Sequence, residues 1–223
     1  MNFVFLGPPG VGKGTQAVAL AAEFSIPHIS TGDILREEIK AGTELGRLAQ
    51  SYIDDGNLVP DRVAVDIIRN RLGKDDAKNG YILDGFPRTV PQAEMFEQLL
   101  KELGQRLDLV VYLEASEEVL VKRLSGRRVC RDCGKIFHLV NMPPKTEGVC
   151  DLCGGELYQR PDDQPEAIRH RFRVYQDKTA DLIRWYDEKG LLTRVPGDIH
   201  WEKTYEMLRE IFASIDGGSS EIN

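Results

Sequence analysis

The sequence predicts an α/β protein built on a parallel sheet of about five strands, with helices covering both faces. Apolar runs of strand length alternate with helical segments along most of the chain, which is the pattern of repeated strand–helix–strand units. The first apolar run, Phe3–Leu6, leads directly into a glycine-rich segment and then into a helical pattern. With 223 residues, the chain is long enough to bury one main core that carries inserted subdomains.

The glycine-rich segment Gly7–Thr15 has the spacing of a P-loop. Phe3–Leu6 is expected to form a buried strand before it, and Gln16–Phe24, rich in Ala and Leu, the helix after it. In this context backbone N–H groups and the helix N-terminus surround a phosphate, and Lys13 supplies a full positive charge. Gly14 stands where Ser or Thr would coordinate Mg²⁺, so the usual side-chain ligand is missing. The alternative is an ordinary glycine-rich turn between a strand and a helix.

Residues 30–59 are predicted to form a helical insertion rather than part of the sheet. Thr31 or Asp33 is expected to cap the helix Ile34–Lys40. The stretch that follows is divided into short helices and loops by Gly42, Gly46, Gly56 and Pro60.

A further strand is expected at Tyr81–Asp84, a short apolar run that ends in a carboxylate. P-loop proteins commonly place a carboxylate near magnesium at the end of a buried strand, so Asp84 is a candidate for that position. The alternative is that Asp84 only begins a turn before Gly85. Helices are expected before and after this strand in the chain, at Arg62–Leu72 and Pro91–Leu103.

Basic side chains gather after the next predicted strand, Leu107–Glu114. The helix that follows this strand runs into Arg123, Arg127 and Arg128. Two interpretations are open: these arginines complement the negative end of a helix dipole, or they bind phosphate. In a chain with a P-loop and a net negative charge, phosphate binding is favoured. Arg36, by contrast, has the spacing of a solvated helix face.

Four cysteines form two C-x-x-C-G pairs about sixteen residues apart, Cys130 with Cys133 and Cys150 with Cys153. This is the spacing of a zinc ribbon, in which the glycine after each pair lets the turn direct backbone N–H groups at the sulfurs. Four thiolates complete the coordination of Zn²⁺, which predicts a structural metal rather than a catalytic one. The segment between the pairs is too short for its own core, so the metal would supply much of its folding energy. Disulfides or four free thiols are the alternatives.

The last part of the chain is predicted to return to the main domain. Arg160 closes the cysteine-containing insertion, and a long helix follows at Pro165–Lys189. Leu191–Val195 is the last expected strand, and Trp201–Ile215 a terminal amphipathic helix. The tail, residues 217–223, is low in complexity and is expected to be frayed.

Composition narrows the possible functions. Apolar residues make up 41% of the chain and charged residues 29%, as in soluble globular proteins. The net charge of −7 argues against nucleic-acid binding, and it requires any anion site to be built from locally clustered Arg and Lys. No apolar run reaches transmembrane length and no signal peptide is recognisable, so we expect a cytoplasmic protein with reduced cysteines.

Four motifs carry a resemblance to a known family: Gly7-x-Pro9-Gly10-x-Gly12-Lys13-Gly14-Thr15, Ser30-Thr31-Gly32-Asp33, Asp84-Gly85-Phe86-Pro87-Arg88-Thr89 and Gly126-Arg127-Arg128. Together they resemble the adenylate kinases of the long-lid bacterial type, which carry a zinc site of four cysteines in the lid. The correspondence runs from Met1 to about Ile215. In this family Gly14 is the rule, because magnesium is held mostly through phosphates and waters, with the carboxylate at Asp84 nearby.

The resemblance implies the reaction ATP + AMP ⇌ 2 ADP on a P-loop NTPase-type core with a parallel five-stranded sheet. The core would comprise residues 1–29, 60–127 and 164–223, the helical NMP-binding insertion 30–59 and the zinc-containing, ribbon-like lid 128–163. The implied cofactors are structural Zn²⁺ and the Mg²⁺ that enters with ATP. The implied partners are ATP, AMP and ADP, with no nucleic acid and no membrane, and a monomer is expected.

The resemblance also implies roles for individual residues. The catalytic side chains around the transferring phosphoryl group would be Lys13, Arg88, Arg123, Arg127, Arg160 and Arg171. ATP would contact Pro9, Gly10, Val11, Gly12, Lys13, Gly14, Thr15, Arg123, Arg127, Ile136, Phe137 and Ile199. AMP would contact Thr31, Arg36, Asn57, Leu58, Val59, Gly85, Phe86, Pro87, Arg88, Gln92, Arg160 and Arg171, with Gln92 reading the adenine edge. Zinc would be bound by Cys130, Cys133, Cys150 and Cys153, and magnesium by Asp84 through water, while Asp162 and Asp163 would help to hold the lid hinge.

The attacking AMP phosphate oxygen is already anionic at pH 7, so the reaction needs no catalytic base, and the motif positions hold no His–Asp or Ser–His pair. Three other functions stay open. A UMP or CMP kinase would share most of the motifs, although the long metal lid and Gln92 disfavour it. A zinc-ribbon protein would bind nucleic acid or another protein, although the net charge of −7 speaks against nucleic acid. A P-loop ATPase would need no acceptor nucleotide.

Overall fold

Five strands form the central sheet of the protein: β1 (Asn2–Leu6), β2 (His28–Ser30), β3 (Tyr81–Asp84), β4 (Leu109–Glu114) and β8 (Leu192–Pro196). The computed structural model, which describes residues 1–218, orders them β2-β3-β1-β4-β8, and every neighbouring pair is parallel. This arrangement confirms the predicted parallel sheet of five strands.

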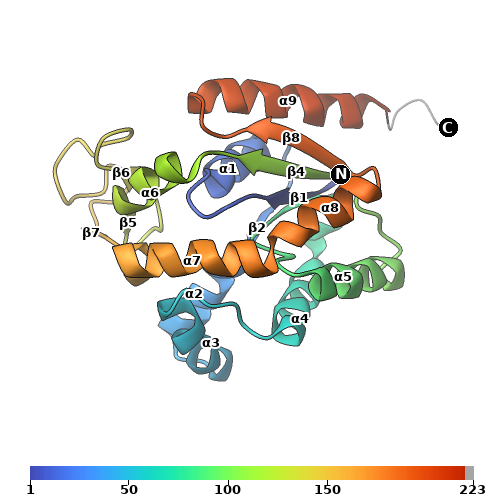
Figure 1. Cartoon of the computed structure of the whole chain (residues 1–223), viewed down its shortest axis with the longest axis horizontal. Coiled ribbons are helices and arrows are strands. Elements are labelled where there is room, and N and C mark those ends of the chain that lie inside the picture. The colour runs from blue at the N-terminus through green and yellow to red at the C-terminus, as the bar shows by residue number, and fades with distance from the viewer. Residues whose placement is uncertain (219–223) are drawn as a thin grey trace.

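Helices cover both faces of the sheet. In chain order the α-helices are α1 (Lys13–Glu23), α2 (Thr31–Ala41), α3 (Glu44–Asp54), α4 (Asp61–Leu72), α5 (Val90–Glu102), α6 (Glu117–Ser125), α7 (Pro165–Lys178), α8 (Ala180–Glu188) and α9 (Trp201–Gly218), and short 3₁₀ turns lie at η1 (Asp75–Ala77) and η2 (Pro161–Asp163). Figure 1 shows α9 on one side of the sheet and α5 with α8 on the other. Residues 217 and 218, which we expected to fray, end α9, and the rest of that tail lies outside the described residues.

Side chains of β1 point alternately into two hydrophobic cores, one on each face of the sheet. Phe3 and Phe5 belong to the core beneath α1 and α9, where the ring of Phe3 stacks on that of Phe212 with 3.7 Å between centroids. Val4 and Leu6 belong to the core on the opposite face, together with residues of α4, α5 and α8. Because both faces of the strand are buried from Phe3 to Leu6, this stretch is apolar at every position, as a strand in a parallel sheet requires.

The insertion between β2 and α4 consists of α2 and α3, which pack closely against each other. Gly46 permits this contact, because a Cβ atom there would lie 2.1 Å from the carbonyl oxygen of Glu38. The predicted cap of the first helix is wrong. The helix begins at Thr31, earlier than the predicted start at Ile34, so Ser30 occupies the N-cap and its hydroxyl accepts a 3.2 Å hydrogen bond from the Asp33 N–H.

A second, antiparallel sheet follows α6. Its strands are β5 (Arg127–Cys130), β6 (Ile136–His138) and β7 (Leu157–Tyr158), in the order β6-β5-β7. The hydrophobic cluster of this sheet contains only the buried residues Cys130, Phe137, Cys150 and Leu157. Such a small core supports little folding energy of its own, and two of its four members are cysteines.

The predicted helix at Pro165–Lys189 is wrong as a single element, because the chain divides it into α7 and α8 at Thr179. The buried hydroxyl of Thr179 donates a 2.8 Å hydrogen bond to the backbone carbonyl of Arg88, a residue far away in the sequence. The other predicted strands and helices are present, with small shifts at their ends. Across residues 1–218, none of the helices combines the length and the apolar character that crossing a membrane requires.

Candidate active site

A cavity of about 590 Å³ lies where the P-loop, the α2–α3 insertion and the antiparallel sheet face one another. It is situated at the carboxyl ends of β1 and β3, the edge at which open parallel sheets usually bind ligands. The cavity brings together most of the predicted site residues: Pro9, Gly10, Val11, Gly12, Lys13, Gly14, Thr15, Thr31, Arg36, Asn57, Leu58, Val59, Asp84, Gly85, Arg88, Gln92, Arg123, Arg127, Ile136, Phe137, Arg160, Arg171 and Ile199.

Two predicted AMP contacts, Phe86 and Pro87, do not line this cavity. The ring of Phe86 is buried in the core and meets the ring of Phe96 edge-on, with 5.4 Å between centroids. Pro87 lines a smaller neighbouring cavity of about 70 Å³. The segment presents Gly85 and Arg88 to the main cavity, and the AMP contacts of the two residues between them stay predictions that the lining of this cavity does not support.

Lys13 is held above the P-loop by the loop's own backbone. Its Nζ donates hydrogen bonds to the carbonyl oxygens of Gly7, at 2.8 Å, and Pro8, at 3.0 Å. Gly7 has a φ of +144°, and a Cβ atom there would lie 2.4 Å from the carbonyl oxygen of Leu113, so only glycine fits this turn. Burial lowers the pKa of Lys13 to about 8, even though the nearby charge of Asp84 acts in the opposite direction. An anionic ligand at this position would stabilise the charged form.

Asp84, at the end of β3, faces the start of α1. Its Oδ2 lies 3.2 Å from the place that a Cβ atom on Gly14 would occupy, so a serine or threonine there would crowd the carboxylate. The same oxygen lies 3.4 Å from Nε2 of His28. Burial acts to raise the pKa of Asp84, but the hydrogen bond from His28 and the charge of Lys13 hold it below its usual range. The carboxylate thus lies next to the position at which most P-loops carry a hydroxyl side chain.

Buried arginines from separate elements surround the centre of the cavity. Burial and the neighbouring charge of Arg171 lower the pKa of Arg88 to about 10, and burial and the charge of Arg36 do the same for Arg160. Each guanidinium is therefore held against the repulsion of its neighbours, yet remains charged at neutral pH. In a chain with a net charge of −7, such local clustering of arginines is what an anion site requires.

Acidic partners fix several of these arginines. Arg36 donates a 2.5 Å hydrogen bond to Asp33, and Arg160 lies 3.8 Å from the same carboxylate, which joins the α2–α3 insertion to the segment after β7. Arg171 pairs with Asp162, 3.0 Å away in η2. These contacts hold the arginine side chains at the cavity wall without the help of a ligand.

Gln92 lies in the first turn of α5 and is buried. Its Oε1 accepts a 2.8 Å hydrogen bond from the backbone N–H of Arg88, and its Nε2 donates a 2.8 Å hydrogen bond to Oδ1 of Asp61. The hydroxyl of Thr89 donates to the same Asp61 oxygen, at 3.0 Å. Our sequence analysis missed Asp61, because the contact joins residues far apart in the chain and no motif marks it. Thr31 also lines the cavity, and its hydroxyl donates a hydrogen bond to the carbonyl of Gly85, at 2.8 Å.

At the other end of the cavity, Arg123 connects two loops. Its Nη1 donates to the carbonyl oxygens of Gly197, at 2.5 Å, and Val11, at 3.3 Å, beside Phe137 and Ile199. The cavity wall also contains residues that the sequence analysis did not select, namely Gln16, His138, Asn141, His200 and Trp201. None of them belongs to a motif with a known spacing, so the sequence offered no signal for them.

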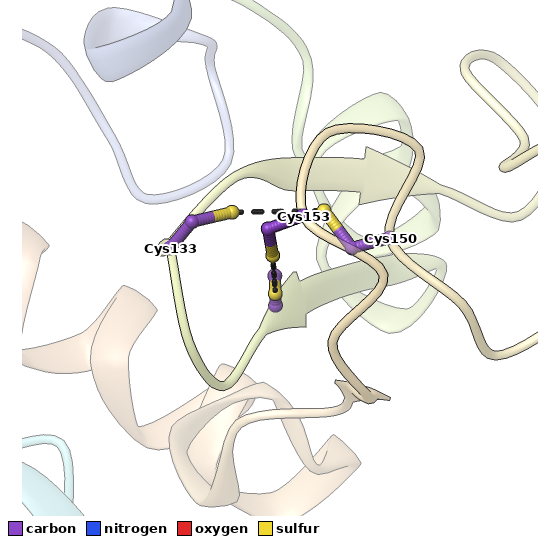
Figure 2. A group of neighbouring side chains, drawn as sticks. Cys133, Cys150 and Cys153 are labelled. Carbon is purple, nitrogen blue, oxygen red and sulfur yellow. Dashed lines mark hydrogen bonds between the residues drawn. The ribbon is translucent and has the colours of Figure 1, made fainter.

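The four cysteines gather outside the cavity: Cys130 ends β5, and the other three lie in loops of the antiparallel sheet. Their sulfurs lie within 4.8 Å of one another, with 3.4 Å between Cys130 and Cys153 and 3.6 Å between Cys133 and Cys150 (Figure 2). These separations are far longer than a disulfide bond of about 2.05 Å, which rules out the disulfide alternative. Tetrahedral Zn–S bonds of about 2.3 Å place sulfurs about 3.8 Å apart, so the set fits Zn²⁺.

Backbone N–H groups around the sulfurs favour thiolates. The N–H groups of Cys133 and Asp132 lower the pKa of Cys130 to about 7 despite some desolvation. Cys150 accepts a 3.4 Å hydrogen bond from the Leu152 N–H. The Gly155 N–H acts in the same direction on Cys153, but the surrounding sulfurs raise the pKa of that thiol to about 12. This donor set is what a metal with thiolate ligands requires.

Comparison with known proteins identifies the family that shares these features. The family model described as adenylate kinase matches residues 5–191. The adenylate kinase of Caldicellulosiruptor saccharolyticus is 50% identical over 215 residues, which cover 96% of this chain and 99% of that protein. The adenylate kinase of Archaeoglobus fulgidus is 49% identical with the same coverage, and that of a Geobacillus species is 48% identical, covering 96% of this chain and 100% of its own.

Proposed function

The chain belongs to the adenylate kinase family and catalyses ATP + AMP ⇌ 2 ADP, and we propose that its cavity holds the two nucleotides end to end, with their phosphates in the centre. The observation that carries this proposal is the convergence of basic side chains from six different segments on one cavity: Lys13, Arg88, Arg123, Arg127, Arg160 and Arg171. Two polyanions can approach each other only where such charges offset their repulsion.

We assign the donor nucleotide to the P-loop side of the cavity. The backbone of residues 9–15 would surround the ATP phosphates, and Lys13 would contact the outer ones. Arg123, Phe137 and Ile199 form the wall where the donor adenine would lie. The hydrogen bonds from Arg123 to Val11 and Gly197 keep this wall attached to the P-loop.

We assign the acceptor nucleotide to the side formed by the α2–α3 insertion and α5. Arg36 and Arg88 would bind the AMP phosphate, and Thr31 and Gly85 would border its ribose and base. Gln92 would read the adenine edge, with residues 57–59 completing the pocket. Of the alternatives, a UMP or CMP kinase would require a pocket that fits a pyrimidine in place of this purine contact.

The chemistry then depends on position and charge. The attacking oxygen of AMP is anionic at neutral pH, so the site needs no general base, and its task is to align the two phosphates and to exclude water. The arginines hold the phosphates in line for transfer, and the flanking segments 30–59 and 128–163, which we regard as the NMP-binding insertion and the lid, enclose them. Mg²⁺ entering with ATP would lie near Asp84, bound through water, and would offset phosphate charge.

We assign a structural Zn²⁺ to the four cysteines. Closed coordination by four thiolates supplies folding energy to a segment with a very small core, and no cysteine lines the substrate cavity. Unpaired thiols of this kind suit a reducing compartment such as the cytoplasm.

An enzyme-coupled assay with ATP and each of AMP, UMP and CMP tests the proposal. AMP is expected to be the preferred acceptor, and Lys13→Met is expected to lower kcat/KM by about 10²–10³-fold, as the loss of one transition-state contact does. Lys101→Met, on an exposed part of α5, is the matched control and should leave the rate unchanged. Preference for UMP or CMP would overturn the acceptor assignment, and phosphate release without AMP at the same rate would indicate an ATPase.

A further inference from the structure

We propose that Asp61 is a positioning residue that sets the enzyme's selectivity for the base of the acceptor nucleotide, by fixing the direction in which the Gln92 amide faces. The inference rests on the proposed function, in which Gln92 reads the edge of that base. Asp61 belongs to α4 and is not itself among the residues that line the cavity. It would act on the substrate only through Gln92.

The amide of Gln92 is held at both of its ends. On one side Oε1 accepts from the backbone N–H of Arg88, at 2.8 Å, and on the other Nε2 donates to Oδ1 of Asp61, also at 2.8 Å. Gln92 is only 2% exposed, so these contacts are made away from bulk water. A primary amide at such a site has two possible orientations, related by exchange of its oxygen and nitrogen.

Only one of these orientations is compatible with the neighbours. A backbone N–H can only donate, and an ionised carboxylate can only accept. Reversal of the amide would set its NH₂ group against the Arg88 N–H and its oxygen against the Asp61 carboxylate. Both contacts would then join like groups in a buried position, where an unpaired polar group is costly. The hydrogen-bonding pattern that Gln92 presents to the cavity is therefore fixed before the substrate arrives.

The groups left for the substrate are one N–H of Nε2 and one lone pair of Oε1. The Watson–Crick edge of a 6-aminopurine carries an acceptor at N1 and a donor at the 6-amino group, and it complements this pair. A 6-oxopurine carries the reverse pattern, a donor at N1–H and an acceptor at O6. It would be recognised only by the reversed amide. The arrangement therefore favours AMP over IMP, although Asp61 itself contacts neither.

Asp61 also has a structural contact, which the test must separate from this role. Its Oδ1 accepts from the hydroxyl of Thr89, the N-cap of α5, and so joins α4 to α5. Loss of that contact alone would lower stability without changing which way the amide faces. Thr89→Ala removes the helix cap and the contact with Asp61 but leaves both hydrogen bonds of the Gln92 side chain in place.

The experiment measures kcat/KM for AMP and for IMP, with ATP as donor, in the wild-type protein, D61N and T89A. The side chain of D61N can donate or accept, so it tolerates either orientation of Gln92, and only the Arg88 N–H still opposes reversal. We expect the AMP-to-IMP ratio of D61N to fall about tenfold, mostly through a higher KM for AMP with kcat little changed. T89A should have a lower melting temperature with the wild-type ratio.

A double-mutant cycle with Q92A measures how far the effect of Asp61 on selectivity depends on the Gln92 amide. In the Q92A background D61N should leave the AMP-to-IMP ratio unchanged, because no amide remains to be oriented. An unaltered ratio in D61N, or the same change in both backgrounds, would overturn the proposal. The wild-type protein gives a test that needs no variant: equal use of AMP and IMP shows that the amide is not fixed. If the wild-type protein does not phosphorylate AMP at all, the proposed function fails instead.

Discussion

Arg127 and Asp163 form a two-point ion pair, with 2.7 Å between Nε and Oδ2 and 2.6 Å between Nη2 and Oδ1. Asp163 is fully buried in η2, and its Oδ1 also lies 3.2 Å from Nη1 of Arg171. One carboxylate thus fixes the positions of two of the arginines in the cavity wall. Paired, forked contacts of this kind restrict direction as well as distance.

Asp163→Asn is expected to lower the free energy of unfolding by about 3 kcal/mol, because it leaves two buried guanidinium groups without their shared counter-charge. Urea denaturation measures this loss. Asp181→Asn is the matched control, since Asp181 forms a largely exposed pair with Arg184 at 3.5 Å and should lose less than about 0.5 kcal/mol. A saturating bisubstrate nucleotide should reduce the deficit of D163N, because its phosphates supply negative charge to the same arginines. Equal losses in the two variants would contradict this account.

Nucleotide binding should take up a proton near pH 8.5. The pKa of Lys13 is lowered by burial from 10.5 to about 8, and a bound phosphate restores the charged form. Titration calorimetry in two buffers with different ionisation enthalpies measures the uptake, and K13M should abolish it. Identical binding enthalpies in both buffers for the wild-type protein would show that Lys13 does not change its protonation.

The same shift makes stability depend on pH, with a sign that follows from proton counting. Between about pH 8 and pH 10.5 the unfolded chain holds more protons at Lys13 than the folded protein does. The contribution of this group to the free energy of unfolding therefore rises with pH across that interval. The difference between wild-type protein and K13M in urea denaturation should follow this rise, and a difference that falls with pH would contradict it.

Removal of the metal should affect the fold before it affects the chemistry. Elemental analysis is expected to find one zinc per chain, and a strong chelator should lower the melting temperature. While the chelated protein is still folded, its initial rate should stay close to that of the untreated protein, because no cysteine lines the substrate cavity. An immediate loss of rate with an unchanged circular dichroism spectrum would assign the metal to the reaction itself.

Thr179→Val should weaken both stability and catalysis. The variant keeps the shape of the side chain but leaves the carbonyl of Arg88 without its 2.8 Å hydrogen bond, which costs about 1–3 kcal/mol in a buried position. Because Arg88 is one of the arginines assigned to the phosphates, kcat should also fall. Thr179→Ser retains the hydroxyl and should restore both quantities, as measured by urea denaturation and the coupled assay. Equal behaviour of the two variants would assign no role to the hydroxyl.

Features encoded by local patterns could be predicted from the sequence. The five parallel strands, the P-loop and the clustered cysteines each depend on residues close together in the chain or at a fixed spacing. The position of Gly14 looked irregular at the sequence level. The structure offers a reason, since Oδ2 of Asp84 lies only 3.2 Å from the place that a Cβ atom at residue 14 would occupy, so a side chain there would crowd the carboxylate.

Features that depend on distant contacts could not be predicted. No glycine or proline marks the division between α7 and α8 in the sequence. The division lies at Thr179, whose hydroxyl binds the carbonyl of Arg88, and a contact between residues so far apart in the chain leaves no local pattern. Asp61 has no motif, because its role comes from packing between α4 and α5. Phe86 shows the opposite case: it belongs to a motif, but its ring turns into the core, which the motif does not indicate. Ser30 and Thr31 are neighbours and both are residue types that commonly cap helices, so the sequence pattern alone does not show which of them is the N-cap of α2.

The crowding of arginines described above has a consequence for the protein in its natural surroundings. Since Arg88 and Arg160 are held against the charges of Arg171 and Arg36, part of the folding free energy is spent on keeping like charges together. Small multivalent anions such as sulfate or pyrophosphate, which relieve that repulsion, should therefore protect the fold against heat more than chloride at equal ionic strength. The melting temperature of this protein is then expected to rise with the concentration of phosphate compounds around it.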